Sequence, residues 1–171
     1  MNKYPISMRL LHFLLILIIF AQLTVGYGFD LIFEKLGANT FLILHKSLGL
    51  LGLIVVILLI LRRLFYTKPP YPNTLSKGQQ YLAKLVHLLL YLTVIAMGSS
   101  GMLVSMLFNS HWLWFYIIPL PQIISPNPQL GSELFSVHTY GAIVLSLLVA
   151  LHFLGALYHG VKRDGITKRM F

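Results

Sequence analysis

The chain has 171 residues, of which 57% are hydrophobic and only 10% are charged, and its mean hydropathy is +0.81. Such values indicate an integral membrane protein rather than a soluble globular domain. Because the chain contains no cysteine, disulfides, thiolate-held clusters, zinc–thiolate sites and the C-x-x-C-H attachment of covalent haem are all excluded.

Four apolar segments are predicted to cross a membrane as helices, at about residues 8–28, 41–61, 82–108 and 135–159. Each has about 20 or more mostly apolar residues, which is the length that the hydrocarbon core of a bilayer requires. No sequence repeats at a fixed period. We therefore expect an all-α transmembrane four-helix bundle that forms a single domain over residues 1–171.

The first segment has the alternative of being a cleavable signal peptide. No A-x-A-like cleavage site follows its apolar run, and the run is long for the core of a signal peptide. We expect the segment to be retained, which matters because cleavage would remove His12.

Basic residues predict the orientation of the bundle. Eleven of them lie before the first segment, between the second and third, or after the fourth, whereas only Lys35 and Lys46 lie on the other side. By the positive-inside rule, both termini are predicted to be cytoplasmic. Nucleic acid is not expected as a partner, because no basic helix interleaved with aromatic residues lies outside the membrane segments. The eleven are Lys3, Arg9, Arg62, Arg63, Lys68, Lys77, Lys84, Lys162, Arg163, Lys168 and Arg169.

Three features of the connecting segments suggest local structure. Asn39 and Thr40 are candidate capping residues for the second helix, and the sequence PNTLSKG at 72–78 predicts a turn. The loop at 108–133 is aromatic and proline-rich with almost no charge, and residues 112–116 suit an interfacial aromatic belt. A short amphipathic segment on the outer surface is the favoured interpretation of this loop, and a lid over an outer cofactor is the alternative.

Two histidines in the fourth segment, His138 and His152, give the main functional signal. Fourteen residues at about 100° and 1.5 Å each place them about 40° apart on one helical face and about 21 Å apart along it. Polar side chains at such depth raise a functional hypothesis by default, and two imidazoles at this spacing suggest axial ligands for two stacked haems. His45 matches His138 in depth, so these two residues are a candidate pair. Nearby glycines at 49, 52 and 141 would let a porphyrin or a backbone approach closely.

The cytoplasmic half contains more histidines than a second haem needs, namely His12, His87, His152 and His159. Since His12 and His87 each follow a basic residue by three positions, both are predicted to be shallow, closer in level to His159 than to His152. An inner pair then includes a histidine of the fourth segment, but periodicity does not identify its partner.

The segments LLHFLL, LHKSLGL, KLVHLLLYLTVIAMGSSGML and SVHTYGAIVLSLLVALHFLGALYHG resemble the bacterial cytochrome b-561 family, whose best characterised members act as superoxide oxidases. The chain is also similar to the cytochrome b subunits of formate dehydrogenases and nickel-iron hydrogenases. The resemblance implies two haem b groups, with His12 and His152 as ligands of the inner iron and His45 and His138 as ligands of the outer iron. It leaves His87 and His159 free to serve a quinone site.

The expected activity is that of a superoxide:quinone oxidoreductase, which oxidises superoxide at the periplasmic face and reduces quinone at the inner side. Imidazoles can bond a quinone carbonyl and relay protons, and Arg9 lies near the same interface. On the outer side, Lys46 adjoins the candidate ligand His45 and is the expected catalytic cation. The outer charges are Asp30, Glu34 and Glu133 against Lys35 and Lys46, so no long-range steering of an anion is expected.

Two other functions compete with this one. The chain could be a membrane-anchor and electron-relay subunit for a periplasmic dehydrogenase or cytochrome partner, with the aromatic outer loop as the docking surface. A haem-free transporter is the third interpretation, and a single visible spectrum would eliminate it.

Overall fold

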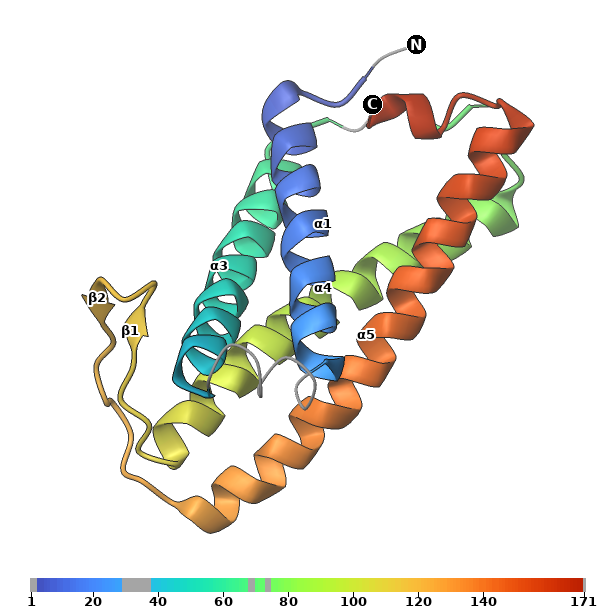
Figure 1. Ribbon diagram of the computed structural model, residues 1–171. Coiled ribbons are helices and arrows are strands. Elements are labelled where there is room, and N and C mark those ends of the chain that lie inside the picture. The colour runs from blue at the N-terminus through green and yellow to red at the C-terminus, as the bar shows by residue number, and fades with distance from the viewer. Residues whose placement is uncertain (1–2, 29–37, 68–69, 73–74, 171) are drawn as a thin grey trace.

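The structure is a computed structural model, and it describes residues 3–28, 38–67, 70–72 and 75–170. The described residues form four helices that are long and apolar enough to cross a membrane, which confirms the predicted all-α transmembrane bundle (Figure 1). They are α1 (Ile6–Tyr27), α3 (Ala38–Leu64), α4 (Lys77–Leu107) and α5 (Pro128–Lys162), with a small hairpin of β1 (Leu113–Trp114) and β2 (Ile118–Pro119) and a 3-10 helix η1 (Thr167–Arg169).

The start of α4 shortens the predicted turn at 72–78: the Leu75 amide donates to the Pro72 carbonyl at 3.0 Å, as a turn requires, but the helix begins at Lys77. Ser76 Oγ accepts a hydrogen bond from the Gln79 amide, and the Gln79 side chain accepts one from the Ser76 amide. This capping box satisfies two amides that the first helical turn leaves free. As a result Lys77 and Gly78 are helical, and the helix begins five residues before the predicted apolar segment.

The other helices also extend beyond their apolar runs. Asn127 Oδ1 accepts from the Leu130 amide and Pro128 occupies the first helical turn, so α5 begins seven residues earlier than predicted. Helix α3 begins at Ala38, so Asn39 and Thr40 lie inside its first turn rather than ahead of it. Hydropathy therefore identified the apolar parts of these helices and missed their ends.

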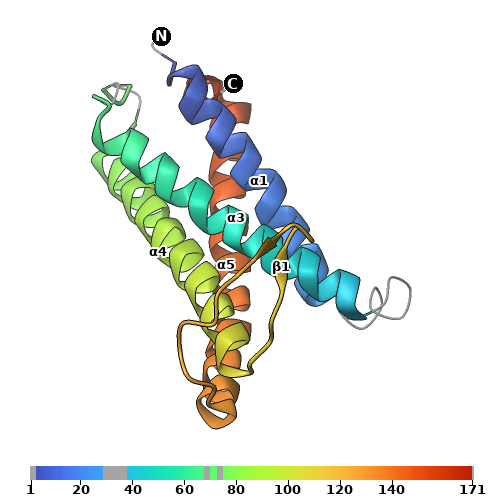
Figure 2. The ribbon, with the colours of Figure 1, turned by 90° about the vertical axis from the view of Figure 1, so that its left-hand side faces the viewer.

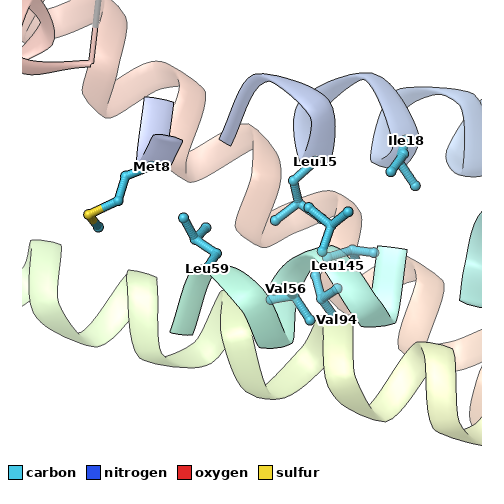
Figure 3. Packing of buried hydrophobic residues seen from close by; sticks show 8 residues of the cluster. Met8, Leu15, Ile18, Val56, Leu59, Val94 and Leu145 are labelled. Carbon is cyan, nitrogen blue, oxygen red and sulfur yellow. The ribbon is translucent and has the colours of Figure 1, made fainter. Parts of the chain in front are cut away.

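The core lies mainly between α1 and α3. Helix α1 packs against α3, α3 against α4, and α4 against α5. Val94 of α4 and Leu145 of α5 join the central cluster (Figure 3). Many other large apolar side chains are exposed, as expected for helices whose outer faces contact lipid. The buried cluster is Met8, Leu15, Ile18, Val55, Val56, Leu59, Val94 and Leu145.

Helix α5 packs closely against one neighbour only. Its backbone lies close to that of α4 over a long stretch and to that of α1 at few points, and within the described residues it does not come close to the backbone of α3. In Figure 1 it is inclined to α1 and α3, and Figure 2 shows the four helices from the side.

Both ends of the chain lie at the same end of the bundle (Figure 1). The Tyr4 amide donates to the Arg169 carbonyl at 3.0 Å, and Arg9 Nε donates to the Met170 carbonyl at 3.1 Å. This arrangement agrees with an even number of membrane crossings.

Candidate functional site

Two pairs of imidazoles face one another across the space beside α5. His45 of α3 and His138 of α5 have ring centroids 6.3 Å apart and planes inclined by 79°. His12 of α1 and His152 of α5 have centroids 6.2 Å apart and planes inclined by 71°. Helix α5 thus contributes one imidazole to each pair, at two levels of the bundle.

The centroid distances can be tested against the geometry of a shared metal ion. With a metal–imidazole bond of about 2.0–2.1 Å and a ring nitrogen about 1.1 Å from its ring centre, two imidazoles on opposite sides of one ion have centroids about 6.2–6.4 Å apart. The distances in both pairs lie in this range. The residues present therefore fit two metal centres with two imidazole ligands each.

His87 of α4 also lies against His152, with ring centroids 5.0 Å apart. That distance is too short for two imidazoles on opposite sides of one ion. His87 Nδ1 instead contacts the carbonyl of Ala83, one turn earlier in α4. The geometry thus favours His12 over His87 as the partner of His152, a choice that periodicity left open.

The predicted shallow position of His12 and His87 is wrong, because both rings lie at the level of His152. The prediction took the nearest basic residue as a marker of the membrane surface. Lys84 lies seven residues inside α4, and Arg9 lies inside α1, where its side chain extends to the Met170 carbonyl. Long basic side chains can extend from within a helix to the surface, so their Cα atoms do not mark it.

A cavity of about 700 Å³ adjoins His45 and His138, within the range of about 300–1,000 Å³ typical of small-molecule and cofactor sites. Its lining is mostly apolar and includes several glycines. A Cβ added at Gly101 would lie 3.1 Å from Cε1 of His138, so a side chain there would crowd the imidazole. The lining glycines are Gly26, Gly49, Gly52, Gly98 and Gly101.

The hydrogen bonds of the imidazoles are consistent with metal ligation. Within the described residues, the Nδ1 atoms of His12 and His45 are buried without a hydrogen-bond partner, a costly state for a polar atom unless another group satisfies the ring. Ser100 Oγ lies 2.9 Å from His138 Nδ1 and donates to the Met97 carbonyl. Since a hydroxyl has one proton, His138 donates Nδ1–H to Ser100, and Nε2 keeps the lone pair that a metal ion needs.

The sequence analysis missed three residues of this region. Gln22 Nε2 donates to the His45 carbonyl at 2.8 Å, and Ser100 and Gly101 shape the surroundings of His138. The available signals were a lone amide in an otherwise apolar segment and the small-residue run at 98–101.

Lys46 lies at the same cavity. Its Nζ donates to Ser110 Oγ at 2.7 Å and lies 5.9 Å from the centre of the Trp112 ring. It is the only Lys, Arg, Asp or Glu among the described residues that line the cavity. Glu133 lies exposed on α5, while the other predicted outer charges, Asp30, Glu34 and Lys35, fall outside the described residues, as does Lys68 on the predicted inner side.

The aromatic loop is a hairpin fixed to α3, not the amphipathic segment that was favoured. Trp114 Nε1 donates to the Ser47 carbonyl, and the Phe115 amide donates to Ser47 Oγ. Ser47 is fully buried. Trp112, at the start of the hairpin, forms part of the cavity wall. The alternative of a lid over an outer cofactor stays a prediction.

The three candidate quinone residues are not brought together by any contact in the described part of the chain. His87 lies beside His152, and Arg9 bonds the Met170 carbonyl. His159 Nδ1 lies 2.6 Å from Asp164 Oδ2. Burial raises the pKa of Asp164, but the hydrogen bonds from His159 and the Ile166 amide, with the nearby Lys162 charge, outweigh burial and hold that pKa below its usual value.

The amino-acid sequence is similar to one protein family and to several bacterial proteins. The model of a family described as prokaryotic cytochrome b561 matches residues 3–171. The chain is 30% identical to the probable superoxide oxidase CybB of Yersinia pestis, over 74% of this chain and 72% of that one. It is 25% identical to cytochrome b561 homolog 1 of Escherichia coli (strain K12), over 78% of each chain. It is 27% identical to cytochrome b561 homolog 2 of the same organism, over 74% of this chain and 68% of that one.

Proposed function

Because the chain belongs to the prokaryotic cytochrome b561 family, and is therefore a haem-binding membrane electron-transfer protein, we propose that it carries electrons from superoxide to a quinone through two haems. The observation that carries this proposal is the pair of imidazole–imidazole distances, 6.3 Å at one level and 6.2 Å at the other.

In this proposal His45 and His138 hold one haem b, and His12 and His152 hold the other. A haem b held by these residues would supply transfer of single electrons. Helix α5 fixes the separation of the two centres, because its two histidines lie fourteen residues, or about 21 Å, apart along the helix. Ser100 keeps His138 in the tautomer that can bind metal.

Lys46 attracts the anionic substrate at short range. Its ammonium lies at the cavity beside His45, where the surrounding apolar wall weakens solvent screening. Oxidation of two superoxide ions releases two molecules of oxygen and two electrons. Those electrons, with two protons from the aqueous phase, convert one quinone to its quinol. The similarity to a protein named probable superoxide oxidase supports this choice of donor.

The quinone is placed near the inner pair, where unused imidazoles lie. His87 packs against His152 and is available to bond a quinone carbonyl, and His159 and Arg9 lie on the same side of the bundle. An imidazole can both hydrogen-bond a carbonyl and pass a proton near neutral pH. The excess of basic residues on this side supports a cytoplasmic position for it and for both termini, with the chain in the inner membrane.

A second candidate function is electron relay for a periplasmic dehydrogenase or cytochrome partner. The tip of the hairpin favours it, since Tyr116, Ile117 and Ile118 are 50%, 78% and 48% exposed. An exposed apolar group next to a redox centre is a suitable docking surface.

A single experiment distinguishes the two functions. The purified, haem-loaded chain is exposed to enzymatically generated superoxide while its visible spectrum is recorded, and a short-chain ubiquinone is then added. We expect reduction by superoxide and reoxidation by quinone with no other protein present. A chain that superoxide does not reduce, but that a periplasmic redox protein does, would be a relay subunit.

A further inference from the structure

Asp164 is a carboxylate for which the proposed function has no use. It follows the end of α5, and its side chain is only 2% exposed. Its Oδ2 lies 2.6 Å from Nδ1 of His159, and its Oδ1 accepts from the Ile166 amide at 3.2 Å. Both carboxylate oxygens are therefore engaged, one by a side chain that can carry a proton and one by the backbone.

The position of this carboxylate is unusual for a simple surface charge. The chain has only four acidic residues, and the other three, Asp30, Glu34 and Glu133, lie between α1 and α3 in the sequence or near the start of α5. The C-terminal end of a helix has a partial negative charge and disfavours a nearby carboxylate. Lys162 is close enough to influence Asp164 electrostatically, yet the hydrogen-bonded partner is His159.

The contact determines what the imidazole can do. A carboxylate that accepts from Nδ1–H fixes the proton on that nitrogen, orients the ring and stabilises the doubly protonated form. Nε2 of His159 is then the nitrogen available to a second group. The other neighbours of the ring do not bond Nε2 in the described residues. Tyr158 contacts His159 edge to face, and the Lys162 ammonium lies over the Tyr158 ring.

We infer that Asp164 is a positioning residue that holds His159 as the proton donor to the quinone. The inference rests on the proposed function, because it needs a quinone as acceptor. The quinone takes two electrons through the protein and two protons. A proton on Nε2 of His159 passes to a quinone oxygen and is replaced from the cytoplasmic water, while Asp164 stays ionised throughout.

The test is the reoxidation of the haem-loaded protein by quinone. The protein is reduced with dithionite, mixed with a short-chain ubiquinone and followed spectroscopically over a range of pH. Asp164→Asn keeps an oxygen for the Ile166 amide but removes the charge and the oxygen that accepts from His159, whereas Asp164→Glu keeps the charge. Glu133→Gln, which removes an exposed carboxylate near the other end of α5, is the matched control.

We expect Asp164→Asn to slow reoxidation roughly tenfold or more and to leave both haem spectra unchanged. The pH profile of its rate should differ from that of the parent, because the charge beside the proton donor has been removed. Small weak acids such as imidazole should restore part of the rate, Asp164→Glu should retain most of it, and Glu133→Gln should match the parent.

Two results would overturn the inference: a parent-like rate and pH profile in Asp164→Asn, or equal damage in Asp164→Asn and Asp164→Glu, which would indicate a purely structural contact. If quinone does not reoxidise the parent, the quinone function and this inference both fail. If quinone reoxidises the parent and Asp164→Asn is slow, the inference holds even when superoxide proves not to be the electron donor.

Discussion

The four paired histidines differ in what holds each ring in place. His138 is fixed by Ser100 and enclosed by Gly101, whereas His12 and His45 have buried Nδ1 atoms with no hydrogen-bond partner in the described structure. A buried polar atom without a partner costs about 1–3 kcal/mol. A group that binds the folded chain and not the unfolded one stabilises it by mass action, so the haem-loaded protein should be the more stable form.

At His87 the structure predicts a defect in quinone reduction without loss of haem. His87→Ala should slow reoxidation of the reduced protein by quinone roughly tenfold or more, because a buried hydrogen bond is lost. The measurement is stopped-flow spectroscopy beside a haem assay. If His87→Ala bleaches a haem instead, His87 is a ligand and the inner pair must be reassigned.

At Lys46 the prediction concerns the electron donor. Lys46→Glu should slow superoxide-driven haem reduction by about tenfold or more, since it replaces attraction by repulsion at the cavity. Quinone-driven reoxidation should not change. Lys77→Glu, at the opposite end of the bundle, is the control and should behave as the parent does; equal rates in the two variants would argue against a role for Lys46.

At the scale of elements, the hairpin after α4 connects the loop sequence to the site. Its contacts with buried Ser47 place Trp112 at the cavity wall and leave residues 116–118 exposed at the tip. The same element therefore contributes one residue to the cavity wall and presents an apolar surface at its tip. Hydrogen bonds to one residue of α3, Ser47, thus hold in place a segment that has almost no charged side chains.

Removal of one of those bonds should loosen the hairpin. Trp114→Phe loses the bond from Nε1 to the Ser47 carbonyl, which is typically worth about 0.5–1.5 kcal/mol. Hydrogen exchange at residues 112–120 should become faster, with haem content unchanged. Tyr116→Phe, at an exposed ring, is the control, and unchanged exchange in Trp114→Phe would show that the hairpin does not depend on this contact.

Hydropathy and length were sufficient to predict the four spanning helices, because apolar runs of about 20 residues have few other stable forms in a bilayer. The fourteen-residue spacing likewise selected His138 and His152. The hairpin could not be predicted, since its anchoring residue Ser47 is distant in sequence. The level of His12 and His87 was also missed, because it depends on helix ends and helix tilt, which the positions of Arg9 and Lys84 do not reveal.

At the scale of the whole molecule, α5 organises the candidate electron path. It contributes one histidine to each pair while contacting mainly α4. The cavity beside His45 and His138 is lined by residues of all four helices. The basic residues gather at the end of the bundle that contains both termini. Towards the other end lies the cavity, where Lys46 is the only charged side chain among the described lining residues. The two ends of the bundle therefore differ in charge.

This charge distribution predicts a weak effect of salt on the reaction with superoxide. Steering by a cationic surface falls steeply as the Debye length shrinks from about 30 Å at 0.01 M to about 10 Å at 0.1 M. The sequence places three carboxylates against two lysines on that side, which leaves little long-range attraction. Rates of haem reduction should therefore change little over this range. A steep decline would show that the predicted orientation or the charge count is wrong.

The central claim is that two imidazole pairs hold two haems, and the haem content per chain of the parent and of His138→Ala tests it most directly. The account predicts two haems per parent chain, both low-spin in the reduced spectrum, and one in His138→Ala, because that variant removes a ligand of a single pair. One haem per parent chain, or two retained by His138→Ala, would contradict it.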